Sequence, residues 1–205
     1  MKKLSIFLAL VLCASVFFCV PVSAAGEEAR LYVKASGTAI TVKVKTSAAV
    51  GALQGAVKYD ETAFQYDSAV AAETIAPNNA AASSFSNLAG ATKVALVGDP
   101  STGTSGEWAT LTYSADEGTP AVFDFAGVKA FSASGDKFTP AVKVIMPGDV
   151  DNDKLVTIKD YIRLKRNYCA GVAISGQAEN KDVNMDGTNV ASTDIPQLRK
   201  DLLGL

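Results

Sequence analysis

Apolar and polar residues alternate along most of the chain between about residue 29 and residue 145. In one clear case Ile40, Val42 and Val44 alternate with the polar residues between them. Similar segments occur at residues 57–59, 64–70, 93–97, 109–114, 122–131 and 138–145. This period of two, with Gly, Asn, Asp and Pro between the segments, is typical of strands with one buried face. The pattern predicts an all-β sandwich.

Two parts of the chain depart from this alternation. Residues 71–91 are rich in Ala, Ser and Asn, and we expect a long loop with a short helical turn there. After residue 148 the pattern predicts two short helices, at residues 161–168 and 195–203. We expect these helices to pack antiparallel through five apolar side chains: Ile162, Leu164, Ile195, Leu198 and Leu202.

The N-terminal segment has the organisation of a secretory signal peptide. Lys2 and Lys3 precede an apolar run over residues 4–20, and small residues follow at 22–24. We therefore expect residues 1–24 to be removed and the protein to be secreted. Neither Cys13 nor Cys19 follows the small residue of a lipoprotein cleavage site, so we expect release without a membrane anchor. Only Cys169 would then remain, which excludes an intramolecular disulfide.

An acid-rich loop precedes the first predicted helix. Residues 149–160 place aspartates at positions 1, 3, 5 and 12, which is the spacing of an EF-hand-type calcium loop. Calcium prefers six to eight oxygen ligands, and alternate side chains of a tight loop can supply them. The expected ligands are the side chains of Asp149, Asp151, Asp153 and Asp160, the carbonyl of Leu155, and Thr157 directly or through water. The alternative is a solvated acidic turn.

A second copy of this loop, residues 182–194, precedes the second predicted helix. It begins with the same spacing and closes one residue later than the first. The expected ligands are the side chains of Asp182, Asn184, Asp186 and Asp194 and the carbonyl of Thr188 or Asn189. Together the two loops predict two bound Ca²⁺ ions.

Each loop departs from the ideal pattern in a different place. Position 6 needs a positive φ and is usually Gly, but in the first loop it is Lys154, at a cost of about 1 kcal/mol. The second loop keeps Gly187 and carries its extra residue directly after it. We therefore expect the loops to bind calcium with unequal affinity.

Residues 149–205 resemble the dockerin module of bacterial cellulosomes, with repeats at 149–168 and 182–203. This resemblance implies a small α-helical calcium-binding domain that docks onto a cohesin-bearing scaffold protein. It also implies that recognition lies at loop positions 10 and 11 and at a basic pair in each helix. Carried over by position, these residues are Ile158, Lys159, Lys165, Arg166, Ser192, Thr193, Arg199 and Lys200. The alternative is that the basic residues only solvate the helices. Since the repeats differ here, we expect inequivalent surfaces.

Residues 27–145 resemble a cohesin, the β-sandwich receptor of dockerins. The resemblance lies in three short phrases, at residues 54–60, 93–97 and 109–113. It implies a jelly-roll sandwich that binds the dockerin of another protein. Carbohydrate-binding modules have the same architecture and remain an alternative, as does a structural sandwich without a ligand. A polysaccharide would require exposed aromatic side chains. Side chains alternate along a strand, so Trp108 should point to the side opposite Leu111 and Tyr113. If Leu111 faces the core, Trp108 is partly exposed and is a possible carbohydrate contact.

Composition narrows the possible functions. The sequence has no His, which excludes Ser-His and Cys-His nucleophile pairs and most zinc chemistry. A pair of glycosidase carboxylates is conceivable, but the acidic residues of the sandwich lie mostly in turns, so we expect no enzyme. The formal net charge is −2 and would become more negative without Lys2 and Lys3, which argues against a nucleic-acid partner.

Only residues 146–148 join the two predicted domains, so we expect them to sit against each other with limited freedom. The sequence thus indicates a secreted, non-catalytic cellulosome-type component that supports polysaccharide degradation.

Overall fold

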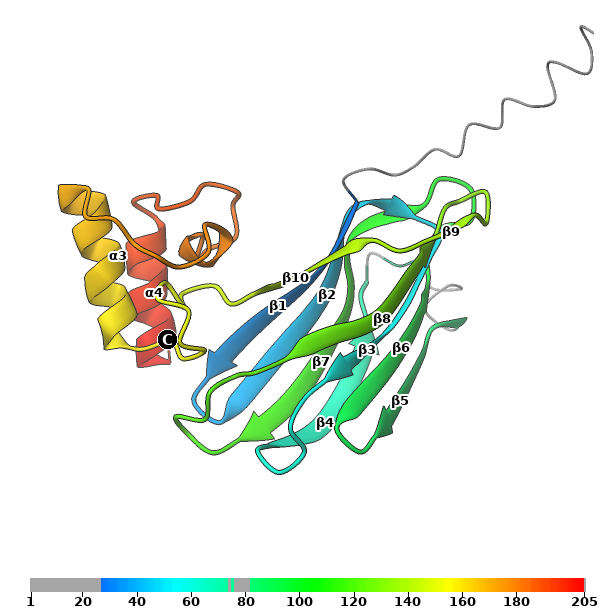
Figure 1. The fold of residues 1–205 in the computed structure, drawn as a ribbon, viewed down its shortest axis with the longest axis horizontal. Coiled ribbons are helices and arrows are strands. Elements are labelled where there is room, and N and C mark those ends of the chain that lie inside the picture. The colour runs from blue at the N-terminus through cyan, green and yellow to red at the C-terminus, as the bar shows by residue number, and fades with distance from the viewer. Residues whose placement is uncertain (1–26, 74, 76–81, 205) are drawn as a thin grey trace, which may run out of the picture.

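A computed structural model describes residues 27–73, 75 and 82–204 of the chain. The expected signal peptide, residues 1–24, lies outside the described residues. The N-terminal part is a β-sandwich of two five-stranded sheets, and the small helical C-terminal part lies beside it (Figure 1). The strand order is β10-β1-β2-β7-β4 in one sheet and β5-β6-β3-β8-β9 in the other. The strands are β1 (Glu28–Ser36), β2 (Ala39–Val50), β3 (Ala52–Lys58), β4 (Phe64–Ala71), β5 (Ser84–Leu88), β6 (Ala91–Val97), β7 (Thr104–Ala115), β8 (Asp124–Phe131), β9 (Lys137–Phe138) and β10 (Ala141–Ile145).

Alternating apolar residues of both sheets form the core of the sandwich. On β2, Ile40, Val42 and Val44 are buried, as their spacing predicts. Aromatic rings fill one part of the core, where Tyr113 lies 4.9 Å from Tyr59 and 5.0 Å from Phe123 between ring centroids. Such tilted contacts between rings stabilise a core beyond the area they bury.

Two segments of the sandwich differ from the sequence prediction. The expected loop at 71–91 contains the edge strand β5, which pairs with β6 from Ser84 opposite Ala95 to Leu88 opposite Ala91. Most of β5 is exposed, so it lacks the alternation that marks a half-buried strand. The single strand expected at 138–145 is two strands. β9 pairs with β8 and β10 pairs with β1, and Pro140, which has no N–H to donate, lies between them.

The C-terminal part contains α3 (Ile158–Ala170), the short 3-10 helix η1 (Glu179–Lys181) and α4 (Asp194–Leu203). A small core of Val150, Leu164, Val183 and Leu198 holds the two loops and the two helices together. Ile195 and Leu202 pack against this core, as expected. The prediction for Ile162 was wrong: its side chain is 50% exposed, and the neighbouring Tyr161 packs inward instead. Among the described residues, no helix is long and apolar enough to cross a membrane.

Candidate metal centres

The first loop brings its carboxylates together around one point. Oxygens of Asp149, Asp151 and Asp153 all lie within 4.8 Å of one another. The loop holds them with its own backbone: the N–H of Asp153 donates to Asp149 Oδ1 at 3.0 Å, and the N–H of Leu155 donates to Asp153 Oδ1 at 2.9 Å. Hard carboxylate oxygens in one tight loop are the donor set that Ca²⁺ prefers.

Asp160 connects this loop to the helix that follows. Its Oδ1 accepts from the N–H of Val150 at 3.1 Å, and its Oδ2 accepts from the N–H of Thr157 at 2.8 Å. Thr157 is the N-cap of α3 and forms a capping box with Asp160. The aspartate that closes the loop is thus also part of the cap of the helix, so loop geometry and helix position are coupled.

The second loop repeats these contacts at equivalent positions. The N–H of Asp186 donates to Asp182 Oδ1 at 3.0 Å, and the N–H of Thr188 donates to Asp186 Oδ1 at 2.8 Å. At the closing position, Asp194 Oδ1 accepts from the N–H of Val183 at 2.8 Å. Asn184 occupies the place of Asp151, and its Nδ2 donates to Asp186 Oδ2 at 2.8 Å. The second loop therefore builds the same scaffold with one carboxylate fewer at its first positions.

The extra residue of the second loop lies later than the sequence suggested. The bond from Thr188 to Asp186 matches that from Leu155 to Asp153, so the two loops stay in register through Thr188. After the insertion, the N–H of Ala191 donates to Asp194 Oδ2 as the N–H of Thr157 donates to Asp160 Oδ2. The insertion thus falls within 189–190, where Val190 has φ +60°. This left-handed conformation is unfavourable for a β-branched residue, so the insertion strains the backbone.

Two further positions have positive φ in both loops. Asn152 and Met185 have φ of +64° and +59°, and Lys154 and Gly187 have φ of +70° and +90°. The expected positive φ at Lys154 is confirmed, so a lysine occupies a conformation that favours glycine.

The electrostatics of the first loop favour a bound cation. Burial raises the pKa of the Asp149 carboxyl above its usual value, and the nearby Asp160 raises it further. Burial also raises the pKa of Asp160, with a contribution from Asp151. A divalent ion would offset both the burial and the repulsion. The side chains of Asp149, Asp151 and Asp153 therefore fit calcium, and Asp160 holds the loop closed through its hydrogen bonds to Val150 and Thr157.

The expected docking residues are all on the surface. Ile158, Lys159, Lys165 and Arg166 are exposed on and around α3, and Ser192, Thr193, Arg199 and Lys200 are exposed at α4. The two surfaces differ: α3 presents Ile158 and Ile162 at 61% and 50% exposure, whereas Ser192 and Pro196 hold the equivalent places at α4.

The prediction that Trp108 is exposed was wrong. Trp108 is fully buried, and its Nε1 donates to Thr46 Oγ1 at 2.9 Å. The cause is a β-bulge. Val44 pairs with Ala109 and Lys45 with Glu107, so Trp108 has no partner on β2 and turns to the core side. This removes Trp108 as a carbohydrate contact.

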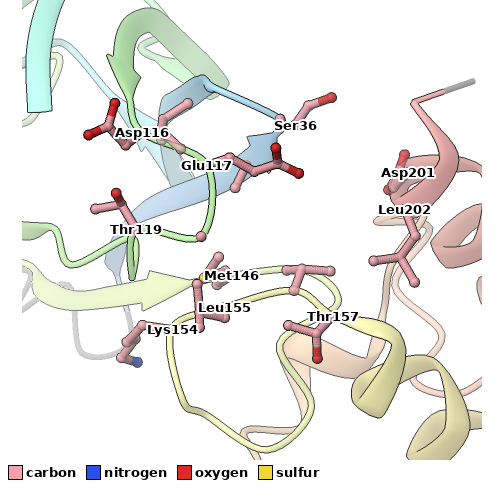
Figure 2. Close-up of a pocket in the computed structure, with 15 residues that line it drawn as sticks. Ser36, Asp116, Glu117, Thr119, Met146, Lys154, Leu155, Thr157, Asp201 and Leu202 are labelled. Carbon is pink, nitrogen blue, oxygen red and sulfur yellow. The ribbon is translucent and has the colours of Figure 1, made fainter.

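The helical part is in direct contact with the sandwich. Lys34 Nζ on β1 lies 2.7 Å from Asp201 Oδ1 on α4, and Lys143 Nζ on β10 lies 2.6 Å from Glu179 Oε1 on η1. The N–H of Ala121 in the sandwich donates to the carbonyl of Lys154 in the first loop at 2.8 Å. Figure 2 shows the pocket between the two parts, with Glu117 and Thr119 on one side and Leu155 and Leu202 on the other.

Asn180, which no sequence motif indicates, fixes this joint. It is 1% exposed. Its Oδ1 accepts from the N–H of Met146 at 2.9 Å, and its Nδ2 donates to the carbonyl of Asp149 at 2.9 Å. Its own carbonyl accepts from the N–H of Gly148 at 2.8 Å. One side chain from η1, between the two repeats, thus holds the connecting segment and the first residue of the first loop.

Comparison with known proteins agrees with this division of the chain. Residues 147–203 match the family model of the dockerin type I domain. The C-terminal part is therefore a dockerin type I domain, and dockerin domains bind calcium. No curated protein matches the chain.

Several solved cohesin structures are similar to the sandwich. The sixth cohesin of scaffoldin B from Acetivibrio cellulolyticus, solved with a dockerin, is 20% identical, with a TM-score of 0.48 over 58% of this chain and 97% of that chain. The OlpA cohesin of Clostridium thermocellum, also solved with a dockerin, is 16% identical, with a TM-score of 0.48 over 59% and 99%. A non-cellulosomal cohesin from Archaeoglobus fulgidus is 13% identical, with a TM-score of 0.46 over 58% and 86%.

Proposed function

We propose that this chain is a secreted, non-catalytic assembly component whose residues 149–204 bind a cohesin on a scaffold protein when both loops hold calcium. One observation carries the proposal. Two loops with the same internal hydrogen bonds each position a helix, and both helices expose basic residues. Calcium, when bound, supplies the charge that lets the carboxylates of each loop stay together.

Side chains of the C-terminal part hold the loops and the helices in place. Asp160 and Asp194 close the loops by accepting hydrogen bonds from backbone N–H groups at both ends of each loop, and Asp160 also caps α3. Leu164 and Leu198 then hold the helices together in the small core. The docking surface therefore depends on metal without including the metal: calcium keeps the helices in place, and the exposed residues of α3 and α4 contact the partner.

The α3 surface is the stronger candidate for the main contact. The fully buried core of a protein interface is more apolar than the polar rim around it. Ile158 and Ile162 lie one turn apart on α3, with Lys165 and Arg166 beside them. At α4 the equivalent apolar positions are Ser192 and Pro196.

The sandwich is proposed as a receptor for a dockerin on another protein. Two of its three cohesin-like phrases fall on β3 and β6, and outward-facing residues of these strands, such as Gln54, Lys93 and Ala95, are exposed. Carbohydrate binding was the alternative, but the residue on which it depended, Trp108, is buried. A chain with both activities would extend an enzyme complex that acts on polysaccharide.

Calorimetric titration of the chain with a panel of cohesin domains tests the first activity. We expect binding in calcium and no binding in EGTA. The variant Asp149→Ala with Asp182→Ala should not bind in either buffer, whereas the matched variant Asp116→Ala, on the sandwich, should bind normally. Binding in EGTA would contradict the proposal.

A further inference from the structure

The two outer faces of the sandwich differ in whether their basic residues have partners within the chain. On the sheet that contains β1 and β2, these residues have partners within the chain. Lys34 pairs with Asp201, Lys43 with Glu107 and Lys143 with Glu179, and Lys45 Nζ lies 4.7 Å from the centre of the Tyr32 ring. These residues already have partners, and the ion pairs of Lys34 and Lys143 hold the helical domain.

The other sheet carries lysines that no ion pair in the described chain includes. Lys58 on β3 and Lys93 on β6 are exposed, and Lys129 on β8 is half-buried. The register places them on one face: Lys129 lies opposite Gln54, Lys93 opposite Ala56, and Lys58 opposite Asp124. Among the described residues of the strands of this sheet, Asp124 is the one acidic residue, so the face keeps a net positive charge.

Small side chains form a hollow between these lysines. A shallow depression of about 450 Å³ is lined by Ala56, Ala95, Ala126, Ser84 and Ser86, with Lys93 at its side. Small residues allow the backbone of a partner to approach closely. The face therefore combines a flat apolar centre with cationic groups around it, as a docking surface requires.

We propose that this face binds a helical docking module whose exposed surface is acidic, and that it rejects the chain's own helical module. The inference rests on the proposed receptor role of the sandwich and adds the charge of the partner. The chain's own helices expose Lys159, Lys165 and Arg166 on α3 and Arg199 and Lys200 on α4. Like charges would meet if one copy docked onto another, and such contacts oppose binding.

This arrangement prevents self-association in a chain that contains both a docking module and a receptor for such modules. If the two surfaces were complementary, each molecule would bind the next, and a head-to-tail contact that does not close makes open filaments. Two basic surfaces prevent this. The chain would remain a monomer until an acidic module and a separate cohesin bind it.

Reversing the charge of one face at a time tests the proposal on the full chain. One variant carries Lys58→Glu and Lys93→Glu on the sheet. Another carries Lys165→Glu, Arg166→Glu, Arg199→Glu and Lys200→Glu on the helices. In calcium, sedimentation velocity should show a monomer for the unaltered chain. Each variant should self-associate at least roughly tenfold more tightly, because a few new ion pairs together supply about 1.4 kcal/mol. Combining both reversals should restore the monomer.

Three controls make the outcome decisive. EGTA should abolish the new association, and Lys43→Glu with Lys45→Glu, on β2 of the other sheet, should leave a monomer. Circular dichroism checks that each variant is folded, and the single change Lys93→Glu provides a milder second test. Monomers for all folded variants would overturn the proposal; normal binding of a dockerin by the sandwich in that case would leave its receptor role intact. Retention of the unaltered chain on polygalacturonate, lost in Lys93→Glu, would also overturn it, in favour of an acidic polysaccharide.

Discussion

At the scale of single residues, the sixth position separates the two calcium loops most clearly. Lys154 and Gly187 occupy equivalent places and both have positive φ. Only the glycine adopts this conformation without cost. The carbonyl of Lys154 also accepts the hydrogen bond from Ala121, so its backbone cannot relax without disturbing the contact with the sandwich.

Lys154→Gly should therefore strengthen calcium binding at the first loop. Relief of about 1 kcal/mol of strain corresponds to a roughly fivefold lower Kd if the loop is ordered only with the metal. Calorimetric titration with calcium measures the change. Gly187→Ala is the matched control and should weaken the second loop by a similar factor. An unchanged affinity in both variants would show that this position carries no strain.

Trp108 gives a second prediction at this scale. Because the side chain is fully buried and hydrogen-bonded to Thr46, Trp108→Ala should destabilise the sandwich by about 3–5 kcal/mol. Urea unfolding monitored by circular dichroism measures this change. Val70→Ala, at an exposed position of β4, should change stability by less than about 0.5 kcal/mol. A loss for Trp108→Ala no larger than this control would contradict the burial.

The local features of the calcium loops could be predicted from the sequence, whereas the long-range contacts could not. Ligand spacing is local, so Asp149, Asp151 and Asp153 could be grouped from their order alone. Burial of Trp108 depends on a bulge between β2 and β7, and parity along one strand does not reveal a bulge. The role of Asn180 depends on contacts with Met146 and Asp149, which are distant in sequence. The strand β5 was missed because its exposed residues carry no pattern.

At the scale of elements, α3 and α4 end alike but differ at their beginnings and on their outer surfaces. α3 begins at Ile158 after a capping box formed by Thr157 and Asp160, whereas α4 begins at Asp194 and its N-cap, Thr193, makes no side-chain cap. Both end at a glycine with positive φ, Gly171 and Gly204. Their inward residues, Leu164 and Leu198, are equally buried. On the outer surfaces, Ile162 corresponds to Pro196 and Ile158 to Ser192. The repeats are therefore equivalent in their inward packing and inequivalent as surfaces.

Alanine substitution of each surface separates the two repeats. Replacing Ile158, Lys159, Lys165 and Arg166 should weaken cohesin binding by a larger factor than replacing Ser192, Thr193, Arg199 and Lys200. The reason is that the α3 set contains an exposed apolar residue, Ile158, that can fill the apolar core of an interface, whereas the α4 set has Ser192 in its place. Calorimetric titration with one cohesin in calcium measures both losses. Equal losses would contradict the inequivalence of the repeats.

At the scale of the whole molecule, the contact between the two parts sets their relative position. The joint has ion pairs from β1 and β10, a hydrogen bond to the first loop, and the side chain of Asn180 at its centre. Met146 itself is buried in the core of the sandwich, which leaves little free chain between the parts. The receptor face of the sandwich and the docking face of the helices would thus be presented in a fixed relation.

Small-angle scattering tests this joint. In calcium, one compact arrangement should account for the scattering curve. Asn180→Ala removes one hydrogen bond to Met146 in the connecting segment and one to Asp149 at the start of the first loop, and should broaden the distribution of separations while the sandwich stays folded. Gln177→Ala, at a nearby exposed position, should leave the curve unchanged. A broad ensemble for the unaltered chain would contradict the fixed arrangement.

The central claim is that calcium holds the docking module in its fold, and amide hydrogen exchange during a calcium titration tests it most directly. Binding and folding should be one event, because the carboxylates of each loop repel one another without the metal. We predict that protection over residues 149–204 rises to its full value with two ions per chain and is lost in EGTA, while residues 28–145 keep their protection throughout. Unchanged protection of the module after chelation would contradict the account.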